Sequence, residues 1–272
     1  MPPPSKYNNE ASPAMTAAVR YITPDGPRRV VRRPKTEAHC QEFQVPHLDG
    51  FISCRLWHNN LVNAPSADIV LLVHGWAANQ TDLFNFVPAL LDHPGKSFSA
   101  LAMDLPAHGQ SSGHRAGLEQ LADGVLSVGG YFKNISAVIA HSIGCAASQL
   151  AIHKGLQTQK AVMLASPQNY QQSTYRYAQR QGLDEKETAE MIAILKEMGV
   201  RTDIRSVDYV PQFKVPALLV HSADDPVVPI ATSESINSYW PDSRLLRVDG
   251  LGHRGILKDK DLIGKVVEFL AE

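Results

Sequence analysis

A serine between small neighbours is the residue around which this chain could organise a chemical reaction. The stretch from Ile135 to Ala151 begins as a short apolar run typical of a buried strand, and it continues with apolar residues three and four positions apart, as in a helix. Ser142 lies where the two patterns meet, with Ala140 two residues before it and Gly144 two residues after it. Small residues at these positions let a helix pack close to a strand, which is typical of a nucleophile elbow. The turn predicts a hydroxyl at a helix N-terminus, where backbone N–H groups can stabilise an oxyanion.

The pentapeptide Ala140-His-Ser-Ile-Gly144 resembles the nucleophile motif of the α/β-hydrolase family, which usually has glycine in place of Ala140. Some small lipases of the family carry the same alanine. Other segments resemble family landmarks and follow in the family's order: they are His74-Gly75-Trp76, Asp104-Leu-Pro-Ala-His-Gly-Gln-Ser111, Asp225-Pro-Val-Val-Pro229 and Gly250-Leu-Gly-His253. The resemblance covers residues 37–272. It implies an α/β-hydrolase fold: a mostly parallel central sheet of about eight strands, with helices on both faces and a short helical cap.

The resemblance also implies a catalytic triad. The family places its acid in a loop after a late strand, a few residues before a Val-Pro or similar helix start. Counting back from Val228-Pro229 gives this position to Asp225, with Asp224 as the alternative. The family carries its base in Gly-x-Gly-His after the last strand, which here is His253. Ser142, Asp225 and His253 then follow the family's order of serine, acid and histidine.

The same resemblance implies an oxyanion hole and an acyl pocket. Its two expected donors are the backbone N–H groups of Trp76, in the His-Gly-Trp segment, and of Ile143, directly after the serine. We expect the side chain of Trp76 to line the acyl pocket. Tyr170 and Tyr175 lie in the segment where the family inserts its cap, and we expect them to contact substrate.

The elements that must position these residues suggest two parts. Residues 1–36 are rich in proline and polar residues and predict an extended or poorly ordered arm. Residues 37–272 form the predicted hydrolase domain, with a cap insertion at about 166–212, where the apolar periodicity changes. Within it, Asp184–Met198 predicts an amphipathic helix that could cover an apolar pocket or dock on the body as a surface helix. The basic run Arg28–Lys35 could contact acidic lipid headgroups or nucleic acid, but we favour a solvated arm.

Composition excludes several classes of protein. The chain has 272 residues, 44% of them hydrophobic, and a net charge of −1, which gives no general case for a nucleic-acid partner. No stretch approaches the 18 apolar residues of a membrane-spanning helix, so stable membrane insertion is not expected. The N-terminal sequence lacks the apolar core of a signal peptide, from which we expect a cytoplasmic location.

The three cysteines do not suggest a disulfide framework. Cys40 and Cys54 could face each other across a hairpin that turns near residues 47–50, although free thiols are the favoured interpretation. Cys145 is expected to pack as a small apolar residue. No His, Glu or Cys pair has metal-ligand spacing, and no phosphate loop or dinucleotide fingerprint occurs, so neither metal nor cofactor is expected.

The functional hypothesis is a serine hydrolase that acts through an acyl-enzyme. Its predicted activity is that of a carboxylesterase on small-molecule esters with short or medium acyl chains, in a monomer or homodimer. A thioesterase, an amidase or aminopeptidase, a lactonase and a carbon–carbon bond hydrolase would use the same triad. An alternative of another class is a ligand-binding homologue that keeps the fold without turnover.

Overall fold

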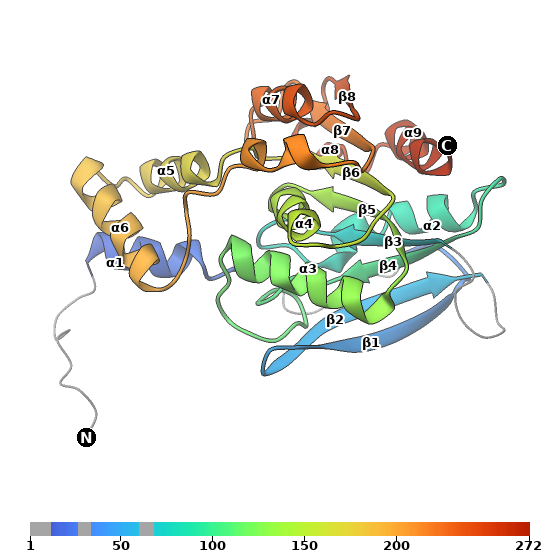
Figure 1. Ribbon diagram of the computed structural model, residues 1–272. Coiled ribbons are helices and arrows are strands. Elements are labelled where there is room, and N and C mark those ends of the chain that lie inside the picture. Colours follow the sequence, from blue (N-terminus) through green and yellow to red (C-terminus); the bar gives the residue numbers. More distant parts are fainter. Residues whose placement is uncertain (1–11, 27–33, 60–67) are drawn as a thin grey trace.

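The computed structural model describes residues 12–26, 34–59 and 68–272, which build a single eight-stranded sheet (Figure 1). The strand order is β1-β2-β4-β3-β5-β6-β7-β8. β2 pairs antiparallel with both β1 and β4, and all other neighbours are parallel, as the α/β-hydrolase resemblance implies. The strands are β1 (His39–His47), β2 (Gly50–His58), β3 (Asp68–Val73), β4 (Phe98–Met103), β5 (Ile135–His141), β6 (Lys160–Leu164), β7 (Ala217–Ser222) and β8 (Ser243–Val248).

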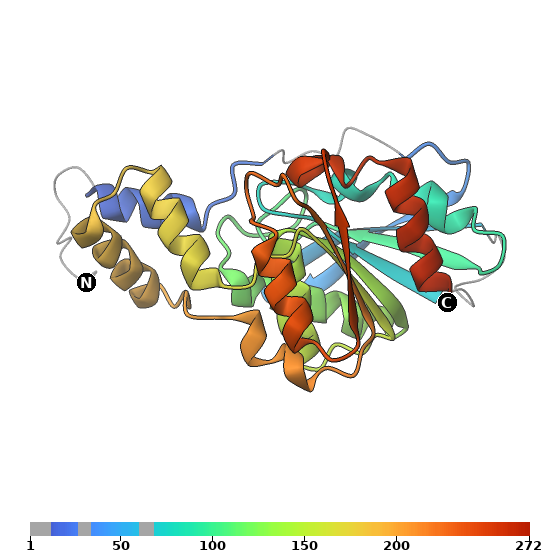
Figure 2. The same cartoon turned by 90° about the horizontal axis from the view of Figure 1, so that it is seen from above.

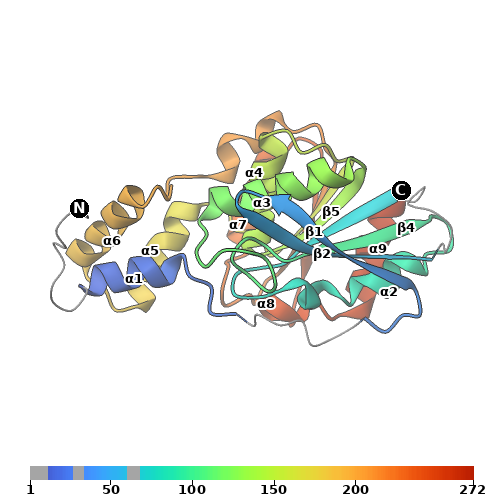
Figure 3. The ribbon, with the colours of Figure 1, turned by 90° about the horizontal axis from the view of Figure 1, so that it is seen from below.

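Helices cover both faces of the sheet, and the side chains of each central strand alternate between them. In β3, Leu71 belongs to one apolar cluster with α3 (Leu118–Phe132), α4 (Ile143–His153) and α7 (Ala231–Tyr239). Leu72 belongs to the other cluster, with α2 (Phe86–Leu91) and α9 (Lys260–Ala271). Figure 3 shows α3 and α4 on one side of the sheet and α2 and α9 on the other. Because both faces are covered, the central strands are continuous apolar runs and every residue of β5 is buried.

Short helices complete the body of the domain. Their bounds are η1 (Gln80–Leu83), η2 (Ser206–Asp208), η3 (Val210–Gln212) and α8 (Gly252–Gly255). No helix among the described residues is long and apolar enough to cross a membrane.

Three helices lie together beyond one end of the sheet and have an apolar core of their own (Figures 1 and 2). Two of them, α5 (Tyr170–Arg180) and α6 (Glu185–Glu197), lie in the segment predicted as a cap insertion. The third is α1 (Pro13–Tyr21), which comes from the N-terminal arm. Buried residues of all three helices share this core: Ala14, Ala17, Ala18, Ala178, Met191 and Leu195. We call α1, α5 and α6 the cap helices.

The prediction of an extended or poorly ordered arm is wrong for residues 13–21. Ser12 caps the helix by accepting a hydrogen bond from the backbone N–H of Met15 at 3.1 Å, and proline occupies the first turn, where it needs no donor. The alanines are spaced three and four apart, so they form one face that packs on α6. Residues 1–11 and 27–33, which include most of the basic run, lie outside the described residues.

Cys40 and Cys54 do not form a disulfide, as favoured from the sequence. They lie on neighbouring antiparallel strands, but the register places Cys54 opposite Phe43 and Cys40 opposite Trp57.

Deletion of residues 1–26 should destabilise the other two cap helices. It would uncover Met191 and Leu195, which are fully buried, at about 1.5–3 kcal/mol for each large side chain. We expect a lower melting temperature and faster tryptic cleavage at Lys186 and Lys196. Deletion of residues 1–11, which leaves Ser12 and α1, is the matched control and should behave like the full chain. Equal protease resistance of both truncated proteins would contradict a structural role for α1.

Candidate active site

Ser142 occupies a strained turn between β5 and α4. Its backbone has φ 53° and ψ −125°, a left-handed value that non-glycine residues rarely adopt. Its own N–H donates to the carbonyl of Leu164 at the end of β6 (2.9 Å). Ile143 begins α4, so its N–H is one of the first-turn donors that have no partner within the helix. The side chain of Ser142 is half-buried, and it lies on the wall of a cavity.

Two glycines allow the end of β3 to approach this turn. A Cβ atom on Gly144 would lie 2.4 Å from the carbonyl oxygen of His74, which is closer than any real contact. A Cβ atom on Gly75 would lie 3.2 Å from the Cβ atom of Ser142. The His-Gly-Trp segment therefore lies directly against the serine, as the sequence motif requires.

His74 fixes the peptide group that joins Gly75 to Trp76. Its Nε2 accepts from the backbone N–H of Leu105 at 2.9 Å, so the proton is on Nδ1, which donates to the carbonyl of Gly75 at 2.7 Å. Burial lowers the pKa of His74 to about 4, so the ring is neutral at pH 7. The carbonyl and N–H of one trans peptide point in opposite directions. The N–H of Trp76 is therefore held pointing away from His74.

Asp104 ties this segment to the next loop. Its buried carboxylate accepts from the backbone and side-chain nitrogens of Gln80 at 2.8 and 3.1 Å, and from the backbone N–H of Gln110 at 2.9 Å. Burial raises the pKa of Asp104 although these hydrogen bonds oppose the shift. These contacts give Asp104 a structural role in holding the loop.

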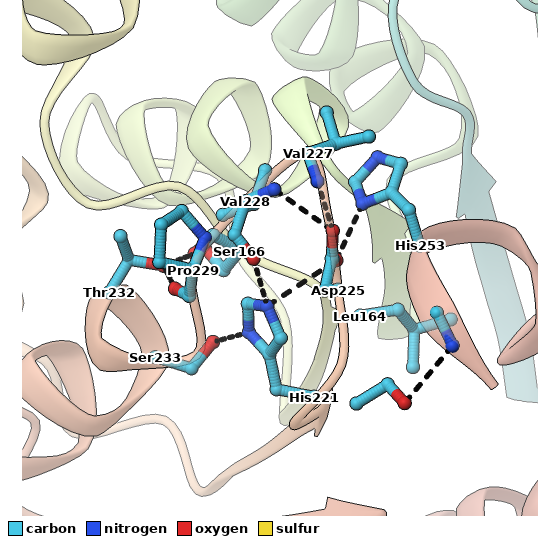
Figure 4. A network of polar contacts seen from close by, with 12 residues as sticks. Leu164, Ser166, His221, Asp225, Val227, Val228, Pro229, Thr232, Ser233 and His253 are labelled. Atoms are coloured by element: carbon cyan, nitrogen blue, oxygen red, sulfur yellow. Dashed lines mark hydrogen bonds and ion pairs between the residues drawn. The ribbon is translucent and has the colours of Figure 1, made fainter. Parts of the chain in front are cut away.

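Asp225 and His253 are brought together from two loops at the carboxyl ends of β7 and β8. Nδ1 of His253 lies 2.7 Å from Oδ2 of Asp225, whose side chain is fully buried (Figure 4). Because this nitrogen faces a carboxylate, it carries the ring proton and leaves Nε2 as the basic nitrogen. Oδ1 of Asp225 accepts from the backbone N–H groups of Val227 and Val228 at 2.8 and 2.9 Å. Burial alone would raise the pKa of Asp225, but its hydrogen bonds outweigh burial and hold the pKa well below its usual value.

His221 is a supporting residue that the sequence analysis missed. Its Nε2 lies 3.4 Å from Oδ2 of Asp225 and 2.8 Å from the carbonyl of Val228, so this nitrogen faces two acceptors and carries a proton (Figure 4). Its Nδ1 lies 2.7 Å from the hydroxyl of Ser233. His221 and His253 thus contact the same carboxylate oxygen from two sides. A histidine at a strand end carries no signal of such a contact, because its partners depend on the loop that follows.

Asp224, the alternative acid, binds the loop that precedes His253. Its Oδ1 accepts from the hydroxyl of Ser222 and from the backbone N–H groups of Gly250 and Gly252, the latter two at 3.1 and 3.2 Å. The hydrogen bond from Ser222, followed by that from Gly252, lowers the pKa of Asp224. Asp224 therefore braces the loop that carries His253, and Asp225 is the aspartate that contacts the ring.

His141 connects the two halves of the site. It directly precedes Ser142, and its Nε2 donates to the backbone carbonyl of His253 at 3.0 Å. The two imidazole rings lie 4.7 Å apart. Burial is the main reason that the pKa of His141 falls to about 3, so the ring donates this hydrogen bond as a neutral group.

A cavity of about 220 Å³ opens between the cap helices and the carboxyl end of the sheet. Ser142, Ile143, Trp76 and Tyr170 line it, which brings four of the predicted site residues to one space. The remaining lining residues are Tyr21, Pro167, Ser173, Arg176, Tyr177, Arg180, Val227 and Val228. α6 packs on α1 and α5, and none of its described residues lines this cavity.

Tyr175, which was predicted to contact substrate, lies away from the cavity. Its side chain is 46% exposed, and it is not among the residues that line the cavity. α5 has 3.6 residues per turn, and its cavity face carries Tyr177 instead. Tyr21 of α1 was missed because the arm was not expected to form part of the site.

The comparison with family models decides the family. Residues 70–263, most of the chain, match the model of the alpha/beta hydrolase family. The chain belongs to the α/β-hydrolase family. A comparison with curated protein sequences finds no match.

Solved structures with the same fold include enzymes of more than one activity. An esterase of Pyrococcus furiosus, Pf2001, is 18% identical, with a TM-score of 0.68 over 90% of this chain and 98% of that one. An esterase of Exiguobacterium antarcticum is 15% identical, with a TM-score of 0.64 over 85% and 99% of the two chains. A proline iminopeptidase of Mycobacterium smegmatis is 14% identical, with a TM-score of 0.60 over 85% and 97%. At these identities the likeness concerns the fold of this α/β hydrolase and not its substrate.

No three histidine, cysteine, aspartate or glutamate side chains gather at metal-binding distance within the part of the chain that the structure describes.

Replacing Gly144 with alanine should destabilise this α/β hydrolase by about 1–3 kcal/mol, because the added Cβ meets backbone and not a movable side chain. The measurement is the free energy of unfolding in urea. Gly130→Ala is the matched control, since a Cβ atom there meets nothing within 4 Å and alanine favours the helix by about 0.5–1 kcal/mol. If both variants gained stability, the close approach of α4 to β3 would be refuted.

Proposed function

We propose that this α/β hydrolase is a serine hydrolase that works through an acyl-enzyme, and that it is a carboxylesterase for esters with short or medium acyl chains. The observation that carries the proposal is the 2.7 Å contact between His253 and a fully buried Asp225, in a site whose cavity is lined by Ser142. A buried carboxylate of lowered pKa keeps its charge, so it can stabilise an imidazolium ring.

Each proposed role follows from the chemistry of the group. Ser142 is the nucleophile, and Nε2 of His253 removes its proton and later returns it to the leaving group. Asp225 holds the ring in the Nδ1–H tautomer and stabilises its charged form. The N–H groups of Trp76 and Ile143 bind the oxyanion, each contributing about 3 kcal/mol. Water then attacks the acyl-enzyme by the same relay.

The size of the cavity supports small or medium acyl groups. A volume of about 220 Å³ is below the range of about 300–1,000 Å³ that is usual for the pockets of drug-sized ligands. Trp76, Ile143 and Val228 give apolar surface beside the serine, where an acyl chain would lie. A long fatty acyl chain would need more volume than this.

Other acyl-transfer reactions remain alternatives within the same proposal, since the triad serves esters, thioesters, amides, lactones and activated carbon–carbon bonds. The structural neighbours include a proline iminopeptidase as well as esterases, so the fold does not choose between ester and amide. A binding protein without turnover is the alternative of another class. The hydrogen-bonded Asp225 and His253 favour an enzyme, because a binding site alone would not need them.

Ser142→Ala should lose hydrolysis of p-nitrophenyl esters by about 10⁶-fold in kcat, with an unchanged melting temperature. We would measure turnover across acyl chains from two to sixteen carbons. The wild-type profile should peak at short or medium chains, since the cavity is small. Undiminished activity in the variant would refute the nucleophile. Labelling of Ser142 by a fluorophosphonate without turnover of any ester would indicate an amide, thioester or carbon–carbon substrate.

Asp225→Asn should lower kcat about 10³- to 10⁴-fold, because an amide can donate to Nδ1 of His253 and so favours the wrong tautomer. Asp224→Asn is the neighbouring control. The three hydrogen bonds to Asp224 all end on Oδ1, and an amide oxygen can accept them, so most activity should remain. A larger loss in Asp224→Asn than in Asp225→Asn would exchange the two roles.

A further inference from the structure

One face of α5 forms part of the cap side of the cavity, and beyond Tyr170 that face carries polar and cationic side chains. Ser173, Arg176, Tyr177 and Arg180 all line the cavity, and their spacing of three, four and seven residues places them on one side of a helix. Arg176 is partly buried and Arg180 is exposed. The proposed hydrolysis uses none of these four side chains.

The two arginines have no carboxylate partner among the described residues, and no acidic side chain lines the cavity. Other arginines of the chain do have one: Arg55 pairs with Glu42 and Arg205 with Asp208. Arg20 and Asp25 lie near Tyr177, whose pKa Arg20 lowers and Asp25 raises. Because their own charges are opposite, this pair does not neutralise the positive charge of α5. Two like charges four residues apart destabilise an isolated helix. A ligand anion would relieve this repulsion.

The opposite wall of the cavity differs in character. Ser142, Ile143 and Trp76 lie on the sheet side, so the cavity has a reactive, apolar end and a cationic end. Guanidinium groups bind carboxylate and phosphate oxygens through paired N–H donors. The hydroxyl group of Tyr177 adds a further donor on the same face, whereas that of Ser173 already donates to the carbonyl of Asn169 at 3.1 Å.

We propose that this cationic face of α5 binds an anionic group of the substrate, a carboxylate or a phosphate, while the bond to be cleaved lies at Ser142. The inference rests on the proposed function for the reaction, and it narrows the substrate class to acyl compounds that carry a negative charge away from the reacting carbonyl. Arg176 and Arg180 are then determinants of specificity.

The first test measures binding in the Ser142→Ala variant, where no turnover interferes. Isothermal titration calorimetry would compare monomethyl suberate with dimethyl suberate, and octyl phosphate with octanol. At least one anion should bind tenfold or more tightly than its uncharged partner. Adding Arg176→Gln and Arg180→Gln should abolish this preference. Lys186→Gln, an exposed residue of α6 away from the cavity, removes charge from the cap and should leave the preference intact.

The second test measures turnover by the wild-type protein. The p-nitrophenyl half-ester of suberic acid should have a kcat/KM at least tenfold above that of p-nitrophenyl octanoate, mainly through KM. This ratio should fall as sodium chloride rises from 50 to 500 mM, because salt screens the arginines. The double arginine variant should lose the ratio.

The outcomes separate the two proposals. Equal binding of every anion and its uncharged partner, or a preference that survives the double variant, would overturn the anion site. Ser142-dependent hydrolysis of uncharged esters would leave the proposed function standing in that case. Tight anion binding that needs the arginines, in a protein that hydrolyses no ester, would instead support the anion site and contradict the esterase. A wild-type melting temperature in the double variant shows that its fold is intact.

Discussion

The approach of α4 to the end of β3 is the constraint on which the site depends. Without a side chain at Gly144, the first turn of the helix reaches the backbone of His74, and Ser142 takes up its left-handed turn. The same contact places the segments that carry Trp76 and Ile143 side by side. A strained conformation persists where its surroundings leave no alternative, and the buried strands and helices on both faces provide such surroundings.

Neutral histidines hold the backbone near the buried carboxylate of Asp225. His74 and His141 are fully enclosed, and burial lowers the pKa of each so that neither competes with His253 for a proton at pH 7. His74 instead donates to the backbone carbonyl of Gly75, and His141 donates to that of His253. The carboxylate of Asp225 keeps its charge because two histidines and two backbone N–H groups surround it. The negative charge of Asp225 therefore acts on the imidazole ring of His253.

The sequence predicted the sheet, its covering helices and the residues that line the reacting end of the cavity, because motifs at strand ends fix both identity and place. The family resemblance placed the acid at Asp225 in preference to Asp224, and in the structure Asp225 contacts His253. The cap was harder to predict. Nothing in the local sequence showed that α6 covers the alanines of α1, and Tyr175 could be separated from Tyr177 only by the rotation of α5 against the body. His221 acts through a loop contact that no local pattern encodes.

The position of α1 has a consequence for the order in which the protein is built. Ser12 bonds to Glu190 across 178 residues of sequence, and Tyr21 bonds to Thr174 across 153. During synthesis α1 leaves the ribosome before its partners, which emerge only after six of the eight strands of the sheet have been made. Contacts of such long range form slowly, because a large loop must close before they contribute. The core of the cap helices therefore forms late, and until then the cavity lacks the part of its wall that Tyr21 contributes.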